Sequence, residues 1–223
     1  MAYILNIETS TTNCSVSLSF EGGTLVLMED YDNNYSHAEK LHVFIEKVLK
    51  QGKIKPSQLE AIAVSKGPGS YTGLRIGVSA AKGLCFALGK PLIAISTLEA
   101  LAYQVKTNDG IIVPMLDARR LEVYSAVFDN NYNRIRETQA QVLNNESFNF
   151  FLEESKVTFI GNGVAKTKEL ISHENAVFIE GKLPSANQMS LLSFNKYKKS
   201  DIEDVAYFEP YYLKDFVAIK PKS

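Results

Sequence analysis

Several features that mark particular protein classes are scarce or missing in this 223-residue sequence. It has only two cysteines, Cys14 and Cys85, in apolar contexts and without a CxxC motif, so no disulfide framework is expected and a reducing cytoplasm is the simplest setting. No stretch approaches roughly 18 consecutive apolar residues, and the N-terminus lacks the basic and long apolar segments of a signal peptide. We therefore expect a soluble cytoplasmic protein that makes no contact with a membrane.

An excess of charge of either sign is missing as well. The chain has 24 lysines and arginines against 25 aspartates and glutamates, which gives a formal net charge of −1. No general basic field is therefore available to attract nucleic acid. Lysines are frequent near the C-terminus, but acidic residues lie among them, as on an ordinary solvated surface.

Residues that carry catalysis are few. The three histidines are His37, His42 and His173, and the first two are separated by about 140° around a helix, so they do not share a face. No Gly-x-Ser-x-Gly motif is present, and neither cysteine has a base near it in the sequence. The sequence therefore predicts no catalytic residue, no metal site and no cofactor.

The most informative stretch is a glycine-rich turn, Lys66–Gly77 (KGPGSYTGLRIG), between a strand expected at 60–65 and a helix expected at about 72–88. It is not a P-loop, because Gly-Lys-Ser/Thr is absent. Backbone amides at a helix N-terminus can hold an anion. In that interpretation the ligand-binding turn consists of Gly67, Gly69, Ser70 and Thr72. The alternative is that the glycines only reverse the chain while Ser70 or Thr72 caps the helix.

Glu8 ends the first expected strand and precedes a run of small hydroxyl residues, Thr9-Ser10-Thr11-Thr12. An acid in this place could hold a metal–phosphate group or orient a water molecule. The alternative is that the hydroxyl residues only cap the turn into the next strand. Both interpretations remain open from the sequence.

The pattern of elements in the first half is strand, strand, strand, helix, strand, helix, strand. Capping boxes at Ser36/Glu39 and Ser96/Glu99 mark two helix starts. The expected strands are 3–8, 14–20, 24–28, 60–65 and 91–95, and the expected helices are 36–51 and 72–88.

The second half repeats this order. The expected strands are 111–116, 122–128, 133–142 and 157–160, and the expected helices are 147–154, one after Gly161-Asn162-Gly163, and 187–198. Two βββαβα halves predict two related α/β lobes with a cleft between them, and a single irregular α/β domain is the alternative. We place the first lobe at 1–107, the second at 108–206, and a tail that packs back on the first lobe at 207–223.

Two helices have faces that favour contact with another helix. Apolar residues recur at i, i+3, i+4, i+7 and i+8 in the helix 36–51, and small residues recur every four positions in the helix 72–88. A glycine inside a helix costs about 1 kcal/mol relative to alanine, so this repetition suggests that another helix approaches closely, within the lobe or from another subunit. The predicted partner interface is Leu41, Phe44, Ile45, Val48, Gly73, Leu74, Gly77 and Ala81. A large residue at Gly77 would then abolish pairing while the monomer stays folded.

Three segments together resemble the TsaB family, also called YeaZ. They are Ile4–Ser10 (ILNIETS), Gly67–Gly77 and Asp117–Tyr124 (DARRLEVY), and the agreement in length and motif order covers the whole chain, with the part beyond about 130 less diagnostic. The resemblance implies the actin/Hsp70/sugar-kinase-like fold, with two ribonuclease-H-like lobes. It also implies a role in the biosynthesis of threonylcarbamoyladenosine in tRNA.

Departures from the catalytic relative, TsaD, bear on activity. That relative has a His-Met-Glu-Gly-His metal motif, and Thr97 and Leu101 stand here in place of its two histidines. A leucine cannot bind a metal. Asp117–Arg120 likewise stands in place of a glycine-containing phosphate turn, and its bulky side chains would narrow a nucleotide cleft. The resemblance therefore implies a fold that is kept without its active site.

From this resemblance we expect a non-catalytic subunit that binds and supports a TsaD-like transferase, together with a TsaE-like ATPase. The modification occurs at the adenosine next to the anticodon, and this chain would contact tRNA only indirectly. Without the partner, the same helix faces would form a homodimer. One alternative is an ATP-binding kinase-like enzyme or a peptidase, with Glu8, the glycine turn and Gly161-Asn162-Gly163 lining its cleft. The other is direct tRNA binding by the lysine-rich C-terminal region.

Overall fold

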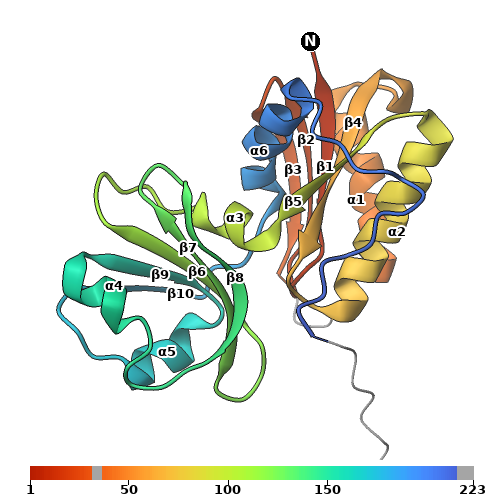
Figure 1. Ribbon diagram of the computed structural model, residues 1–223. Helices are drawn as coiled ribbons and strands as arrows, with labels where there is room; N and C mark the ends of the chain where they lie inside the picture. Colours follow the sequence, from red (N-terminus) through yellow and green to blue (C-terminus); the bar gives the residue numbers. More distant parts are fainter. Residues whose placement is uncertain (32–36, 215–223) are drawn as a thin grey trace, which may run out of the picture.

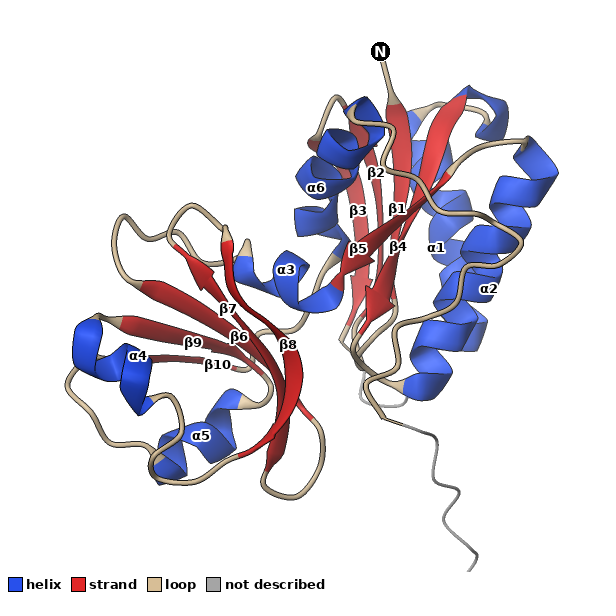
Figure 2. Cartoon of the chain, viewed as in Figure 1, coloured by secondary structure: helices blue, strands red, loops and turns tan. Residues whose placement is uncertain are grey.

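The computed structural model describes residues 1–31 and 37–214, which form two lobes (Figure 1). Each lobe is built on a five-stranded sheet with helices packed against it (Figure 2). The first sheet contains β1 (Tyr3–Glu8), β2 (Cys14–Phe20), β3 (Gly23–Asp30), β4 (Leu59–Gly67) and β5 (Leu92–Ser96). The second contains β6 (Ile111–Asp117), β7 (Glu122–Asp129), β8 (Arg134–Val142), β9 (Val157–Gly161) and β10 (Ala176–Glu180). The helices are α1 (His37–Gly52), α2 (Tyr71–Leu88), α3 (Thr97–Ala102), α4 (Asn149–Glu154), α5 (Val164–Leu170) and α6 (Ala186–Lys198), with a 3-10 turn at Pro56–Gln58.

The two sheets have the same topology. Their strand orders are β3-β2-β1-β4-β5 and β8-β7-β6-β9-β10. In each sheet the second strand is antiparallel to both the first and the third, the fourth is parallel to the first, and the fifth is parallel to the fourth. This repetition confirms the prediction of two related ribonuclease-H-like lobes in an actin/Hsp70/sugar-kinase-like fold.

Helix starts follow the predicted caps where the structure describes them. The Ser70 hydroxyl accepts a hydrogen bond from the Gly73 amide at 3.3 Å, so Ser70 and not Thr72 caps α2. The Ser96 hydroxyl caps α3 in the same way. The predicted cap at Ser36 lies outside the described residues. Strand β10 is not among the predicted elements, because it is a five-residue edge strand without an alternating pattern.

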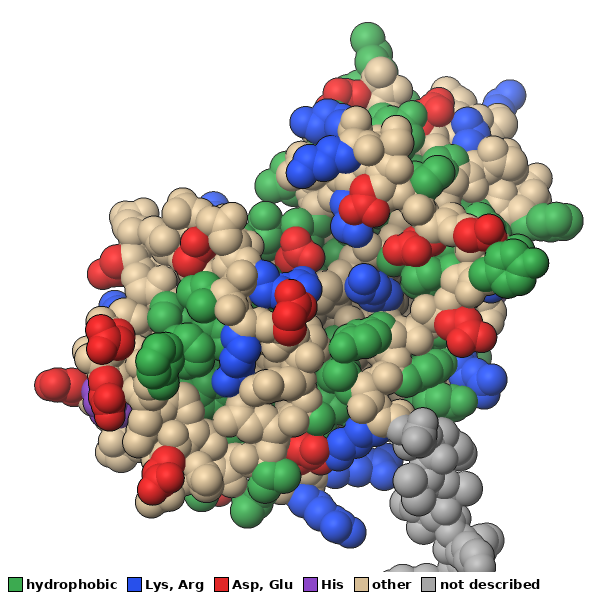
Figure 3. All heavy atoms as spheres, in the orientation of Figure 1, with side chains coloured by type: hydrophobic (Ala, Val, Ile, Leu, Met, Phe, Trp, Pro, Cys, Tyr) green, Lys and Arg blue, Asp and Glu red, His purple; other side chains and the backbone are tan. Residues whose placement is uncertain are grey.

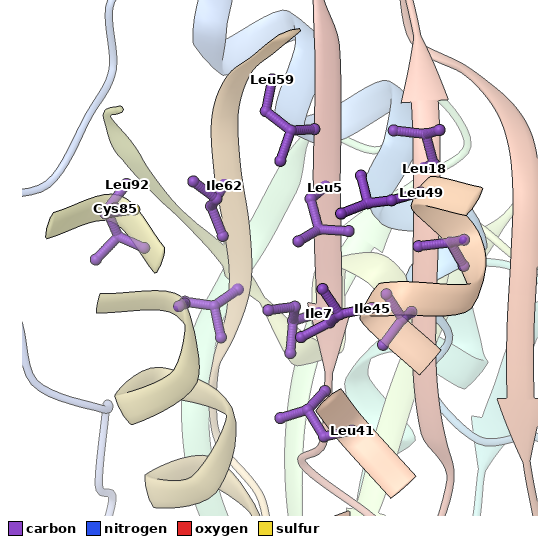
Figure 4. Packing of buried hydrophobic residues seen from close by; sticks show 14 of the residues in the cluster. Leu5, Ile7, Leu18, Leu41, Ile45, Leu49, Leu59, Ile62, Cys85 and Leu92 are labelled. Atoms are coloured by element: carbon purple, nitrogen blue, oxygen red, sulfur yellow. The ribbon is translucent and has the colours of Figure 1, made fainter. Parts of the chain in front are cut away.

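The core of the first lobe lies between its sheet and the pair α1 and α2. Figure 4 shows leucine and isoleucine side chains of α1 pointing at those of β1 and β2. Burying one such side chain contributes about 1.5–3 kcal/mol. The residues that meet here include Leu5, Ile7, Leu18, Leu41, Ile45 and Leu49.

The opposite face of the first sheet is covered by α6, although we predicted that helix for the second lobe. Its Ala186, Met189 and Leu192 pack against β1, β4 and β5. Polar contacts add to this packing, because the Ser193 hydroxyl donates to Asn6 Oδ1 at 2.6 Å and the Ser17 hydroxyl donates to the Ala186 carbonyl at 2.8 Å. The predicted range 108–206 for the second lobe is therefore too long at its C-terminal end.

Strand β2 shows why the alternation of the sequence misleads about exposure. The pattern Cys-Ser-Val-Ser-Leu-Ser-Phe predicts a half-buried strand, yet Ser15, Ser17 and Ser19 are fully buried. They face α6 and hydrogen-bond to it or to neighbouring strands. Both faces of the strand are therefore covered, one by apolar and one by polar packing.

Helix α3 and the C-terminal segment both connect the lobes. Leu98 and Leu101 of α3 pack in one cluster with Ile112 and Leu116 of the second sheet. The C-terminal segment, Glu203–Lys214, runs along the first lobe, and Lys214 pairs with Glu122 of β7. Within the described ranges, no helix is long and apolar enough to cross a membrane.

Candidate functional site

Two other segments of the chain occupy the space next to the glycine turn. The Ser70 amide, at the N-terminus of α2, donates to the Ser10 carbonyl at 2.6 Å. The Tyr211 amide of the C-terminal segment donates to the Lys66 carbonyl at 2.7 Å on the other side. A turn from β1 to β2 and a strap from the C-terminus therefore pack where an anion would approach.

The glycines of the turn are required by these close approaches. A Cβ at Gly69 would meet the carbonyl oxygen of Ser10, and one at Gly67 would lie 2.7 Å from the carbonyl oxygen of Tyr211. Gly67 also has a positive φ of 110°, which a residue with a side chain adopts at a cost. Packing therefore accounts for the glycines of the proposed ligand turn, and Thr72 is exposed at its rim.

Glu8 lies at the end of β1 with no exposed surface. Its Oε1 accepts a hydrogen bond from the Ser10 amide at 2.6 Å, and its Oε2 has no hydrogen-bond partner among the described residues. Burial raises the pKa of this carboxyl, and the hydrogen bond from the Ser10 amide offsets only part of the effect. The side chain is therefore a buried acid near the junction of the lobes and not an open ligand.

Within the described part of the chain, the structure does not group three ligands for a metal ion. Thr97 hydrogen-bonds to Ser65 at 2.6 Å between hydroxyl oxygens, and Leu101 lies in the core that the lobes share. His37 Nε2 lies 2.7 Å from the Thr11 carbonyl, and burial lowers the pKa of its ring. Across residues 1–31 and 37–214, no three histidine, cysteine or acidic side chains are grouped to hold a metal ion.

Most residues of the predicted partner interface face inward. Leu41, Ile45 and Val48 of α1 belong to the core cluster of the first lobe. Leu74 and Ala81 of α2 are equally buried, and only Phe44 of the apolar positions is partly exposed. These buried side chains hold α1 and α2 on their own sheet. The prediction that they form the partner interface is therefore wrong for the buried residues.

The small residues of α2 divide between two faces. A Cβ at Gly73 would meet the Thr9 carbonyl, and a Cβ at Gly77 would meet the Thr9 hydroxyl. The close neighbour of both glycines is therefore the turn after β1, not another helix, and a large residue at Gly77 would disturb the monomer. A Cβ at Gly83, in contrast, meets no described atom within 4 Å.

The outer face of the helix pair is an open groove of about 590 Å³. It is mostly apolar or small in character, with His42 and Arg75 as its basic members. On the same two helices, Phe86 is 88% exposed and Val43 is 45% exposed. The residues that line the groove are Ala38, His42, Arg75, Ile76, Ser79, Ala80, Gly83 and Leu84.

A signal for this outer face is present in the sequence. Ile76, Ala80 and Leu84 follow at intervals of four and form a second apolar stripe on α2, rotated away from the buried stripe of Leu74, Val78 and Ala81. The predicted contact face rests instead on the more regular stripe of small residues. A helix that is apolar on two sides can pack one side on its own core and use the other to bind a partner.

Comparisons with known proteins decide the family. A model of the family described as tRNA N6-adenosine threonylcarbamoyltransferase, TsaD, matches residues 33–222. The tRNA threonylcarbamoyladenosine biosynthesis protein TsaB of Bacillus subtilis is 31% identical, over 95% of this chain and 93% of its own length. This chain belongs to the TsaB family. That membership places it in tRNA threonylcarbamoyladenosine biosynthesis.

Other TsaB proteins and solved structures agree with this assignment. TsaB of Escherichia coli is 29% identical over 97% of this chain and 96% of its own length. The structure of YeaZ from Pseudomonas aeruginosa is 26% identical with a TM-score of 0.81, and it covers 96% of this chain and 100% of that one. A crystal structure from the same organism, described as similar to peptidase YeaZ, has a TM-score of 0.84 at 25% identity with the same coverage.

Proposed function

We propose that this chain is a non-catalytic subunit required for N6-threonylcarbamoyladenosine formation at the adenosine next to the anticodon of tRNA. In this role it binds and supports a TsaD-like transferase in the cytoplasm, and a TsaE-like ATPase joins them. The observation that carries the proposal is the open groove between α1 and α2. Its apolar residues Ile76, Ala80 and Leu84 are partly exposed in the single chain, and exposed apolar surface is typical of a protein interface.

The shape of the groove suits a partner helix. Gly83 and Ala80 keep the surface low, so that another helix backbone can come close, and Ile76 and Leu84 supply apolar contacts on either side. Phe86, three residues after Gly83 on α2, is an exposed aromatic side chain of the kind that contributes strongly to binding. When the transferase is missing, a second copy of this chain would use the same surface.

The absence of an activity of its own is supported by the residues of α3 and of the glycine turn. The residues at the positions of the metal ligands of TsaD are a threonine bonded to Ser65 and a leucine in the core. The amide at the start of α2 and the glycines before it are in contact with Ser10 and Tyr211. An independent ATP-binding enzyme therefore has less support than an accessory subunit.

The test is sedimentation velocity of this chain mixed with the TsaD-like protein of the same organism. We expect a heterodimer boundary with the wild type and its loss with Gly83→Arg, because the new side chain would fill the groove. The matched control is Ala165→Arg, which places the same side chain on an exposed alanine of α5 in the second lobe. Normal assembly of a folded Gly83→Arg variant would overturn the assigned surface, and no heterodimer with the wild type would overturn the proposed partner.

A further inference from the structure

A second surface, on the lobe that does not carry the groove, holds an arginine in unusual surroundings. Arg136 lies on β8, and its guanidinium carbon is 4.8 Å from the ring centre of Phe148 and 5.7 Å from that of Phe151. Its Nη2 donates to the Ser125 hydroxyl at 3.0 Å and to Gln141 Oε1 at 3.3 Å. Two aromatic rings and two neutral acceptors therefore fix the fork in one orientation.

No acidic side chain balances this charge among the described residues. The Nε–H of Arg136 is buried and has no acceptor, and none of the ion pairs of the described ranges includes Arg136. Its neighbour on the same strand, Arg134, is paired with Glu99 and Glu137. Burial lowers the pKa of Arg136, which shows the cost of holding the cation without a carboxylate.

The side chain is nevertheless within reach of solvent. Arg136 and Phe151 are both only partly buried, and Phe150, whose ring contacts that of Phe151 at 5.3 Å between centres, is 76% exposed. Figure 3 shows hydrophobic side chains gathered on this lobe with acidic side chains around them. The site is therefore an aromatic platform with one cation beside it, open on one side.

We propose that Arg136 and the adjoining Phe150–Phe151 surface bind a carboxylate side chain, Asp or Glu, carried by an apolar segment of a partner protein. A guanidinium held in place on aromatic rings is a fixed donor that a carboxylate meets with a charge-assisted hydrogen bond. Its Nη1 nitrogen, which makes no hydrogen bond among the described residues and is not one of the buried atoms, supplies this donor, and apolar neighbours of the acidic residue pack on Phe150. This surface is separate from the groove between α1 and α2, and the inference does not depend on the function proposed for that groove.

The surroundings favour a protein segment over RNA. Exposed glutamates lie close in sequence to the site, on β8 and around α4, and they would repel a chain of phosphates. A single carboxylate among apolar residues carries much less negative charge than a chain of phosphates, so the repulsion is smaller and one contact with Arg136 offsets it. The glutamates are Glu137, Glu146, Glu153 and Glu154.

The probes are two blocked tripeptides, acetyl-Phe-Glu-Leu-amide and acetyl-Phe-Gln-Leu-amide, titrated into the full chain labelled with ¹⁵N. The readout is the Nε–H resonance of Arg136, assigned as the one missing from Arg136→Gln. We expect a saturable shift with the Glu peptide and a Kd at least about tenfold weaker with the Gln peptide, since a hydrogen bond to a charged group is lost. Arg136→Lys should weaken the Glu peptide several-fold, whereas the matched control Arg134→Gln should leave its Kd unchanged.

Equal binding of the two peptides, or no saturable shift up to millimolar peptide, would overturn the proposal. The comparison of the peptides uses the wild type alone, so it stands even if a variant fails to fold. A tRNA anticodon stem–loop is the competing probe. If it moves the Arg136 resonance with a steep dependence on salt while the Glu peptide does not, the site binds nucleic acid and the proposal is wrong.

Discussion

Gly77 and Gly83 lie on one helix, and their replacement by alanine should change stability in opposite directions. A methyl group at position 77 would meet the Thr9 hydroxyl and lie 3.4 Å from Thr9 Cβ and 3.6 Å from Ile7 Cγ2. That hydroxyl donates to the Gly73 carbonyl at 2.8 Å, and the new methyl group would displace it. Overpacking costs about 1–3 kcal/mol, and leaving a buried polar group without its partner costs a further 1–3 kcal/mol or so.

The gain from helix propensity is too small to offset these costs at position 77. Alanine is better than glycine in a helix by about 1 kcal/mol, so Gly77→Ala should lose about 1–5 kcal/mol of unfolding free energy. Gly83→Ala has the same gain and no contact within 4 Å, so it should be stabilised by about 1 kcal/mol.

The assay is urea unfolding of the isolated chain, followed by circular dichroism at concentrations where it is monomeric. The two variants should show midpoints on opposite sides of the wild type with equal slopes. If Gly77→Ala is as stable as Gly83→Ala, the turn after β1 does not pack on α2 as described, and the reasoning fails.

Three further predictions concern the buried acid, the C-terminal strap and the junction of the lobes. The pKa of Glu8 is raised by burial, so the stability that its protonated form contributes is fully present below the ordinary glutamate pKa and is lost as the pH rises through the folded pKa. The unfolding free energy of Glu8→Gln relative to that of the wild type should therefore increase between pH 5 and pH 8. A constant difference would contradict the burial argument. Lys82 Nζ donates to the carbonyls of Ala206 and Phe208 at 3.2 and 2.9 Å, so Lys82→Met should hasten trypsin or chymotrypsin cleavage in the strap, measured by mass spectrometry, while the body of the protein stays intact. Leu101→Ala should cost about 2–5 kcal/mol in urea unfolding, because the side chain is fully buried in the cluster between the lobes; a loss under 1 kcal/mol or so would show that the cluster does not couple them.

The sequence predicts the two lobes well because most of their elements, β10 excepted, have a local signal of their own. Ser70 and Ser96 cap helices as predicted, and the alternation in β2 gives the right element and the right span. These signals depend only on residues that are close together in the chain, so the sequence contains them directly.

The sequence fails where the decisive neighbour is distant. Gly73 and Gly77 are small because Thr9 lies against them, and Ser17 is polar because α6 returns to cover it. Leu41 and Ile45 mark an apolar helix face. A face that packs on the protein's own core and a face that binds a partner have the same spacing of apolar residues, so the sequence does not distinguish them. Arg136 carries no sequence signal at all, since what distinguishes it is the missing carboxylate.

The return of α6 to the first sheet affects the order in which the two lobes can fold during synthesis. The second lobe is inserted between α3 and α6, so the first lobe is discontinuous in the chain. While residues up to β10 leave the ribosome, one face of the first sheet, with Asn6 and Ser17, still lacks its cover. The inserted lobe can close on its own strands during this time, whereas the earlier-synthesised lobe has to wait for the last part of the polypeptide. A nascent chain stalled before α6 should therefore resist protease in its second lobe and be cut in its first.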